Sequence, residues 1–473
     1  MKIPYRFWIA VMIFMTTFTN YMMRSNMSVS IFAMQYKKEG AQGQCSEDGQ
    51  VTTAAPTTTM DPNATTTTTE KPDEGLFHKF TYSQMEQAQI LAGYGYGYVA
   101  TCLLGGFLAE YYGPWKVIFF STLASIVLTV VCVPAAYLHW TALLVARILI
   151  GALGGLIYPA VQILINNWAP KNEKGKFVSA TLGNNLGTVV TFASVGAISQ
   201  AINWAWGFFF VGAFVTCYLI LIFFLLSDSP TKSKLVSSEE KEYLATMIPP
   251  PKTKLVAPYL KIFTSLPFYA LLFSQFCNLY GLFVNIVSVP KFFRDYLNQD
   301  IRRSGFLSAL PPLTRMFAGL GFGAVGDYIE KHRENSSTAV RKSFCIFSHI
   351  LPGITLICIM FVECNWIFAT GLLVLSQGFN GGAVCTILRN SQDLAPNFSG
   401  TLYGIISFTG GTTQFIVPLV MGAVLGTEAY PGLDKWRWVF LIGGGVYIIG
   451  GIIFMAFGTT KEQAWNEPKQ ATA

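Results

Sequence analysis

Residues 141–165 read TALLVARILIGALGGLIYPAVQILI, an apolar run that one charged side chain, Arg147, interrupts. Arg24 lies at a similar depth in WIAVMIFMTTFTNYMMRSNMSVSIFAM, and Arg315 in FLSALPPLTRMFAGLGFGAVG. A helix crosses a bilayer with about 20 mainly apolar residues. A charge at the bilayer centre costs at least ~2.5–3.5 kcal/mol, so it usually faces a bundle interior or a watery cavity. No acidic residue lies at comparable depth, which indicates a positive cavity and therefore anion transport.

Runs of this kind recur along the whole chain. Of its 473 residues, 52% are hydrophobic and 12% are charged, against about 25% charged in a soluble protein. We therefore predict an all-α membrane protein with twelve spans. The predicted spans lie near residues 7–34, 84–109, 115–137, 140–166, 177–199, 204–227, 263–290, 304–325, 342–361, 365–388, 400–425 and 437–458.

The distribution of basic residues predicts the orientation. Lys and Arg concentrate in cytoplasmic loops, and they are more frequent on the side that holds both chain ends. We therefore predict two cytoplasmic termini, with the first span as an uncleaved anchor. This distribution explains the net charge of +7 without a nucleic acid partner.

The predicted outer loop 36–80 is rich in threonine and low in complexity. Such a tract cannot bury a core and is typical of disordered, O-glycosylated stalks. Its sequon at Asn63 predicts N-glycosylation on the outer side. Cys45 in this loop and Cys364 could both face the oxidising side, and whether they pair stays open. No cysteine or histidine spacing in the chain indicates a metal site.

An internal repeat predicts two six-helix halves. GGFLAEYYGPWK, with Glu110, follows span 2, and GFGAVGDYIEKHR, with Asp327, follows span 8. Parallel repeats of this kind are typical of the major facilitator fold. The predicted divisions are an N-terminal half (1–227), a cytoplasmic linker (228–262), a C-terminal half (263–458) and a cytoplasmic tail (459–473). In the linker, SSEE (237–240) predicts a capping box at the start of a short surface helix without chemistry.

The chain resembles the anion:cation symporter family of the major facilitator superfamily, which includes sodium/phosphate cotransporters, sialin-type carriers and vesicular glutamate transporters. The matching segments are RSNMSV, ARILIGALGGLIYPAVQILINNWAPKNEKGK, GFLSALPPL, NSQDLAPNFSGTLYGI and KEQAWNEP. They extend over almost the whole chain. Within the family, the sequence is most similar to invertebrate members described as inorganic phosphate cotransporters.

The resemblance carries over some functional residues and not others. The arginines of the family's first and fourth spans match Arg24 and Arg147. The glutamate that vesicular glutamate carriers place seven residues after the second arginine is Gly154 here. A basic residue of span 7 is replaced by Asn278, and the span 2 histidine of vesicular members by Leu91. These departures argue against a close copy of the proton-linked vesicular mechanism.

Arginine suits oxyanions because its planar fork donates bidentate hydrogen bonds and keeps its charge. Arg147 begins a helical stripe that continues through Gly151 and Gly154 or Gly155 to Tyr158 and Gln162. Tyr158 and Gln162 offer polar atoms on the same face and are predicted to bind substrate with Arg147. The glycines could leave room for a ligand, or they could only allow close helix packing.

Arg24 and Arg315 have structural alternatives. Each could bind substrate, or each could satisfy backbone carbonyls, which for Arg315 would be those freed by Pro311 and Pro312. The substrate-binding prediction also includes the tyrosines at 94 and 98, which could line the cavity or pack against neighbouring helices.

Three residues at inner loops, Glu110, Lys116 and Asp327, are predicted to hold helix ends together in one state of the transport cycle. Oxygen ligands from intramembrane asparagines could bind Na⁺. These asparagines are Asn184, Asn185, Asn278, Asn285 and Asn380. His349 is predicted to be a satisfied core residue rather than a proton relay.

The residues predict a secondary active transporter of anions by alternating access. The family resemblance implies inorganic phosphate as the substrate, and we predict Na⁺-dependent symport at the plasma membrane. The absence of a buried carboxylate favours Na⁺ coupling, or drive by the membrane potential, over proton coupling. One alternative is a proton- or potential-driven organic anion carrier of vesicles or lysosomes. Another is a non-transporting membrane sensor. We predict no enzyme activity, no cofactor beyond Na⁺ as a coupling ion, a small anionic substrate and a monomer in the bilayer.

Overall fold

A computed structural model describes residues 4–36, 45, 78–170, 173–248, 257–332, 337–427 and 432–466. The described chain is helical, with one isolated bridge between Gln35 and Phe80. The helices follow the twelve predicted spans. Several helices run beyond the predicted ends, because hydropathy registers only the apolar part of a helix. α11 (Ile301–His332), for example, continues through the charged segment DYIEKH.

Each half contributes six spans, some of which are divided into shorter helices. The N-terminal spans are α1 (Tyr5–Ala33), α2 (Gln84–Tyr112), α3 (Pro114–Leu138), α4 (Trp140–Trp168), α5 with η1 and α6 (Lys174–Ser179, Ala180–Leu182, Gly183–Ala201) and α7 (Trp204–Leu225). The linker holds α8 (Ser238–Met247) and α9 (Tyr259–Ile262). The C-terminal spans are α10 (Leu266–Asp295), α11, α12 with η2, α13 and η3 (Ser337–Cys345, Ile346–Ile350, Leu351–Cys358, Ile359–Phe361), α14 with η4 and α15 (Trp366–Asn380, Val384–Leu388, Arg389–Leu394), α16 with α17 (Ser399–Gly411, Thr413–Gly426) and α18 (Gly432–Phe457), and η5 (Ala464–Asn466) follows.

Nine spans within the described part of the chain are long and apolar enough to cross a membrane by composition alone. The three predicted spans outside this set are α1, α6 and α11. They carry Arg24, Asn185 and Arg315, respectively. Their polarity follows from their position, because all three lie where the two halves face each other.

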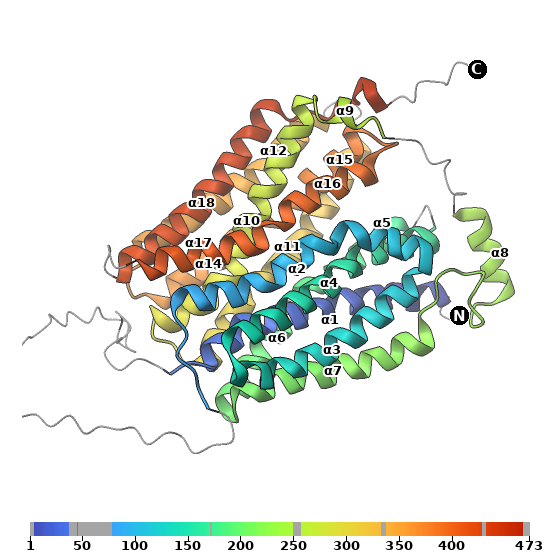
Figure 1. The fold of residues 1–473 in the computed structure, drawn as a ribbon. Coiled ribbons are helices and arrows are strands. Elements are labelled where there is room, and N and C mark those ends of the chain that lie inside the picture. The colour runs from blue at the N-terminus through green and yellow to red at the C-terminus, as the bar shows by residue number, and fades with distance from the viewer. Residues whose placement is uncertain are drawn as a thin grey trace, which may run out of the picture.

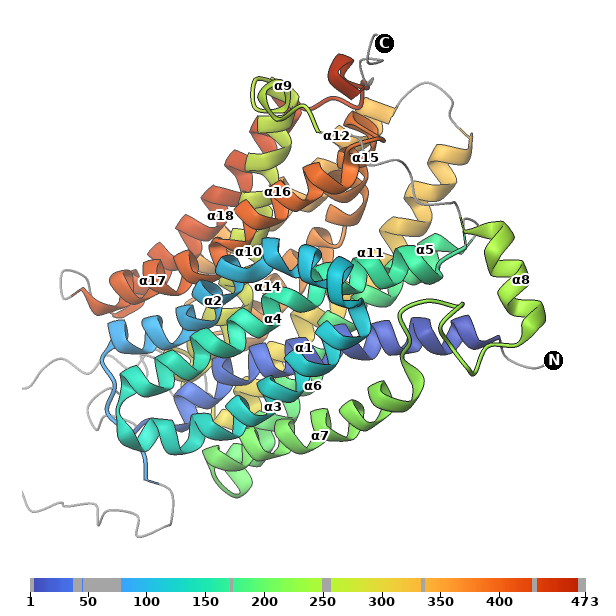
Figure 2. The ribbon, with the colours of Figure 1, turned by 45° about the vertical axis from the view of Figure 1, so that its right-hand side comes forward.

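The two helix bundles form a V (Figures 1 and 2). They meet at the end where α1 finishes and α2 begins, and they spread apart toward the end that holds the start of α1, α8 and η5. In the predicted orientation, the end where the bundles meet is the outer end, and the end where they spread apart is the inner end. The structure is thus closed toward the predicted outer side.

Close packing of α2 against α4 depends on glycines. An added Cβ at Gly97 would lie 1.9 Å from the carbonyl oxygen of Ile148, and one at Gly151 would lie 2.0 Å from that of Tyr94. The helix-packing alternative for the glycines after Arg147 is therefore confirmed.

Two spans contain proline or glycine signals. Span 11 is interrupted between Gly411 and Thr413. α11 continues as one helix through Pro311 and Pro312, although each proline removes a backbone donor from the helical ladder. This helix packs against α6 and α14.

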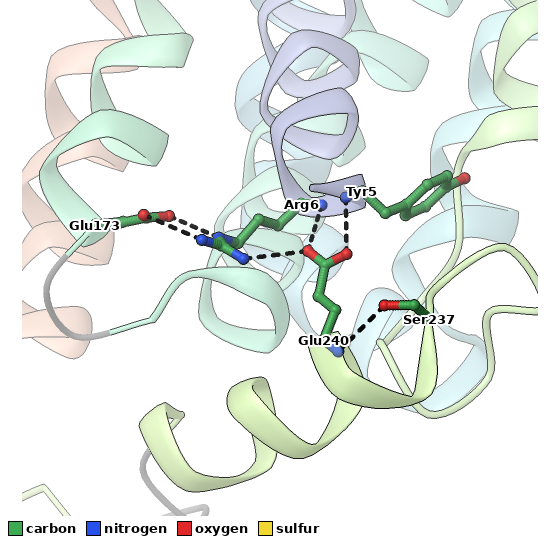
Figure 3. Close-up of polar contacts among 5 residues, drawn as sticks. All are labelled: Tyr5, Arg6, Glu173, Ser237 and Glu240. Atoms are coloured by element: carbon green, nitrogen blue, oxygen red, sulfur yellow. Dashed lines mark hydrogen bonds and ion pairs between the residues drawn. The ribbon is translucent and has the colours of Figure 1, made fainter. Parts of the chain in front are cut away.

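The linker helix α8 docks on the start of α1 (Figure 3). Ser237 Oγ accepts from Glu240 N at 3.2 Å, as the predicted capping box requires. The Glu240 carboxylate, however, accepts from the backbone N–H groups of Tyr5 and Arg6 at 2.8 and 3.0 Å. It thereby caps α1, whose positive helix end and unpaired N–H groups favour an anion. The Arg6 guanidinium joins Glu240 and Glu173 at 3.3 and 2.9 Å.

This contact gives a test of linker docking. Glu240→Ala should lower the thermal unfolding temperature by a few degrees and expose the linker to protease, because hydrogen bonds to a charged group contribute about 1.5–3 kcal/mol each and partial exposure reduces that value. Glu239→Ala removes an exposed carboxylate from the same helix turn and is the matched control. Equal proteolysis of the two variants would contradict the docking role.

The structure pairs Cys45 with Cys364, with 5.3 Å between their Cα atoms. The bond joins the loop after α1 to the start of span 10, and so links the two halves covalently at the predicted outer end. Asn63 and the remainder of the threonine-rich tract lie outside the described residues, as does the side chain of Asp327.

Candidate functional site

The Arg24 guanidinium lies among aromatic rings from both halves. Its Cζ is 4.9 Å from the ring centroid of Tyr21, 5.3 Å from that of Tyr94 and 4.3 Å from that of Phe283. Ring faces attract cations, by about 2 kcal/mol when the pair is desolvated. Among the described residues, no acceptor forms a hydrogen bond with this guanidinium, although Arg24 is only 9% exposed. Its donors are therefore available to a ligand.

Arg147 lies against the ring of the same tyrosine, Tyr94. Its Cζ is 5.4 Å from the Tyr94 centroid, so the two guanidinium groups share one ring. They are at most about 11 Å apart, and Coulomb's law at an effective dielectric of ~20 gives a repulsion of at least ~1.5 kcal/mol. No carboxylate of the described chain offsets this repulsion with an ion pair. A bound anion would offset the repulsion between the two guanidinium groups.

Two of the five N–H donors of Arg147 are occupied. Nη1 donates to the carbonyl oxygen of Met23 and Nη2 to that of Arg24, both at 3.1 Å, while Nε has no partner among the described residues. Arg147 thus fixes the turn of α1 that carries Arg24. Its predicted contact with substrate stays a prediction, and in this state it would require these bonds to exchange.

The predicted room for a ligand below Arg147 is wrong for this state. A Cβ at Gly154 would lie 2.2 Å from the Tyr94 hydroxyl, so the tyrosine fills the space. The resemblance places a glutamate at position 154 in vesicular carriers. Here the space beside Gly154 holds the uncharged ring of Tyr94 from α2. Glycine at 154 and tyrosine at 94 fit each other.

Arg315 bridges the two halves at a central cavity. Its Nε donates to Asn380 Oδ1 at 2.8 Å and its Nη1 to Asn185 Oδ1 at 3.1 Å. The alternative that Arg315 satisfies carbonyls freed by the two prolines is wrong, because side-chain amides take these donors. The cavity has a volume of about 20 Å³, room for one or two waters, and Tyr21 also lines it.

Four oxygens around this cavity have no hydrogen-bond partner in the described part of the chain. They are Asn184 Oδ1, Asn285 Oδ1, Ser308 Oγ and Gln377 Oε1. They come from four helices, α6, α10, α11 and α14. Buried polar atoms are normally paired, so this cluster indicates a place for a polar guest or for water.

The remaining predicted residues are placed as follows. Tyr98 stacks on Tyr94 with 6.2 Å between centroids, and Tyr158 meets the Tyr21 ring edge-on at 6.3 Å, so both belong to the aromatic cluster around Arg24. Gln162 is exposed. Glu110 and Lys116 are exposed as well, and their gating role stays a prediction.

Four site residues, Tyr21, Phe283, Ser308 and Gln377, were not predicted. Tyr21 could have been found, because it lies three residues before Arg24 and shares its helix face. Phe283 and Gln377 give no such signal, since an aromatic ring or an amide in an apolar run has many possible neighbours. Asn185 was considered only as a cation ligand, whereas it holds Arg315.

His349 is fully buried and satisfied, as predicted. Nδ1 lies 2.7 Å from Ser348 Oγ, and Nε2 lies 3.0 Å from Ser274 Oγ and 3.1 Å from the Ser274 carbonyl oxygen. The Ser348 carbonyl in turn accepts from Asn380 Nδ2 at 3.0 Å. His349 therefore supports the asparagine that holds Arg315.

Two helical halves around a cationic, aromatic centre are the arrangement of a membrane carrier. Residues 9–418 match the Major Facilitator Superfamily, and the chain belongs to this family. It is a multi-pass membrane protein, and its relatives are transporters.

Curated relatives place it within the superfamily. Sialin from Homo sapiens is 28% identical over 464 residues, which cover 97% of this chain and 90% of sialin. Vesicular glutamate transporter 1 from Xenopus tropicalis is 28% identical over 83% of this chain and 69% of its own length. A Drosophila melanogaster protein named "Putative inorganic phosphate cotransporter" is 26% identical over 98% of this chain and 87% of its own length.

These relatives match the anion:cation symporter group that the sequence predicts, so the chain is a secondary transporter of this group. Among solved structures, the crystal structure of a D-xylose-proton symporter superposes with a TM-score of 0.64 over 97% of this chain and 100% of its own, at 12% identity. This likeness concerns the fold alone.

Proposed function

We propose that this protein carries small anions by alternating access and that its substrate is inorganic phosphate, taken up with Na⁺. The observation that carries the proposal is the Arg24 guanidinium, which is held by aromatic rings and has no acceptor among the described residues. A phosphate can accept two parallel hydrogen bonds from such a fork. The relative named as a phosphate cotransporter supports this substrate.

Arg315 supplies the second contact in this proposal. Its Nη2 takes no part in the two bonds to asparagine, and Arg315 lines the cavity together with Tyr21. A phosphate between Arg24 and Arg315 would touch both halves at once. Binding at the interface of two rocking halves is the arrangement that alternating access needs.

The unpartnered oxygens of the cavity support Na⁺ as the coupling ion. A sodium ion among neutral oxygens beside Arg315 would be repelled by the arginine unless an anion were bound. The same anion would be bound more tightly in the presence of the cation. Each ligand therefore strengthens the binding of the other, and this reciprocal coupling underlies symport. No buried carboxylate of the described residues offers a proton the same role.

The organic anion carrier stays the second candidate, because sialin and vesicular glutamate transporter 1 cover most of this chain at 28% identity. In both cases we propose two halves (1–227 and 263–458), a cytoplasmic linker (228–262), a cytoplasmic tail (459–473), both termini in the cytoplasm and a monomer. We propose the plasma membrane for the phosphate carrier.

Labelled phosphate uptake into proteoliposomes, with and without an inward Na⁺ gradient, tests the proposal. We expect saturable uptake that rises several-fold with the gradient. Uptake of L-glutamate or sialic acid under a proton gradient or membrane potential, without phosphate uptake, would favour the organic anion carrier. Binding of these anions without flux by a folded protein would favour the non-transporting sensor and contradict both carriers.

A further inference from the structure

Lys291 is a buried cation at the predicted outer end, far from the central arginines. It lies one turn before the C-terminal turn of α10 and is 2% exposed. Its Nζ donates to Gln84 Oε1 and, at 2.7 Å, to Gln87 Oε1, both on α2. The bonds therefore join the C-terminal half to the N-terminal half. The nearest carboxylate, Asp295, is 3.9 Å away and more than one-third exposed.

Arg294, one helical turn from Lys291, makes the same kind of contact. Its Nη1 donates to the carbonyl oxygen of Phe32 and its Nη2, at 3.4 Å, to that of Gln35. These carbonyls belong to the C-terminal end of α1, which carries the negative end of the helix dipole. Both cations thus reach across the boundary between the halves, and both end on neutral oxygens.

The contact is tightly closed around these cations. An added Cβ at Gly422 of α17 would lie 2.3 Å from the Ala88 Cβ of α2, and one at Gly426 would lie 3.6 Å from the Gln84 Cβ. A purely apolar side chain would seal such a junction without the cost of burying an ammonium group among neutral partners. The charge of Lys291 therefore destabilises the closed state of the outer gate. This cost indicates a use for the charge in the open state.

That use follows from the geometry of opening. When the halves separate at the outer end, Lys291 and Arg294 lose their partners on α1 and α2 but stay together on one face of α10, three residues apart. They then face the space between the halves. The acidic groups nearby are Asp295 on the same helix and Glu86 on α2, which caps its own helix through Ser83.

We propose that Lys291 and Arg294 form an outer anion-binding site, shut in this state, that opens with the outer gate and receives the substrate before it reaches Arg24. The proposal rests on the proposed anion transport. Because the partners of these two cations on the N-terminal half are neutral, neither cation has an ion pair across the boundary to break when the gate opens. Asp295 moves with Lys291 on α10 and offsets part of the positive charge. Positive charge at the mouth of a cleft raises the local anion concentration and the rate of association, and salt weakens both effects.

The first test measures phosphate uptake into proteoliposomes at low and high ionic strength. L-glutamate replaces phosphate if the wild-type protein transports only that anion. Lys291→Met should raise KM several-fold at low salt and remove most of its salt dependence, while Lys291→Arg should restore both. Lys79→Met deletes an exposed lysine from the same side and should behave as wild type. If KM and its salt dependence are unchanged in folded Lys291→Met, the proposal is wrong even though transport stands.

A second test does not depend on transport. A cysteine at Gln84 (Q84C) can be labelled from outside with membrane-impermeant thiosulfonates of either charge, and the protein without this substitution serves as the blank. The anionic reagent should react several-fold faster than the cationic one, and Lys291→Met should remove this preference. Equal rates with both reagents while Lys291 is present, or no reaction at all, would overturn the outer site. Failure of every anion to be transported would instead contradict the proposed function.

Discussion

Arg24→Gln is expected to reduce phosphate affinity by roughly 100-fold or more while the protein remains folded. Two charge-assisted hydrogen bonds to the anion would be lost, each worth about 1.5–3 kcal/mol, and each 1.4 kcal/mol is a factor of ten. The fold should tolerate the change, because the guanidinium has no hydrogen bond to lose among the described residues and glutamine removes a buried charge.

The readouts for Arg24 are the KM of phosphate uptake and the thermal unfolding temperature. Arg302→Gln is the matched control: its guanidinium lies 6.0 Å from the Phe306 ring at the predicted outer end, so it also loses a cation–π contact but lies outside the site. Arg24→Lys should recover only part of the affinity, since lysine lacks the planar fork. Wild-type KM in folded Arg24→Gln would show that the anion binds elsewhere.

Arg147→Gln is expected to lower the maximal uptake rate at least ~10-fold with a smaller change in KM. Its two bonds, at 3.1 Å to the carbonyl oxygens of Met23 and Arg24, hold α4 to α1, and charge-assisted bonds of this type contribute about 1.5–3 kcal/mol each. Without them, the turn that presents Arg24 loses its support. A positioning residue of this kind should affect the rate of the conformational cycle more than the binding of the anion.

A KM that rises as much in Arg147→Gln as in Arg24→Gln would contradict this assignment. It would favour the prediction that Arg147 touches the substrate. A contact that is equally strong in the bound state and in the transition state of transport affects KM and leaves the maximal uptake rate nearly unchanged. The Na⁺ dependence of uptake in both variants should follow that of the wild type, because the unpartnered oxygens around Arg315 are unchanged.

Hydropathy predicted the positions of the spans because the cost of placing a residue in a bilayer is a local property. It also predicted that the three arginines face inward. The same reasoning failed below Arg147, where the glycines leave space that Tyr94 then fills.

The family and its general activity could also be predicted from the sequence, because several short segments along the whole chain match the same family. The relatives confirm the group and leave the substrate and the coupling ion as proposals. The motif arginines at 24 and 147 look equivalent in the sequence, since each is a lone cation in an apolar run. Their hydrogen bonds separate them.

The sequence by itself determined the fold class, the depth of the arginines and the transporter group. Only the tertiary structure decided which arginine keeps its donors available, which oxygens meet Arg315 and that Lys291 closes the junction with α2. The physical reason is that burial cost depends on the residue and its neighbours along the chain. Hydrogen-bond partners are chosen by helix packing across the boundary between the halves, and the partner of Lys291 lies 204 residues away in the sequence.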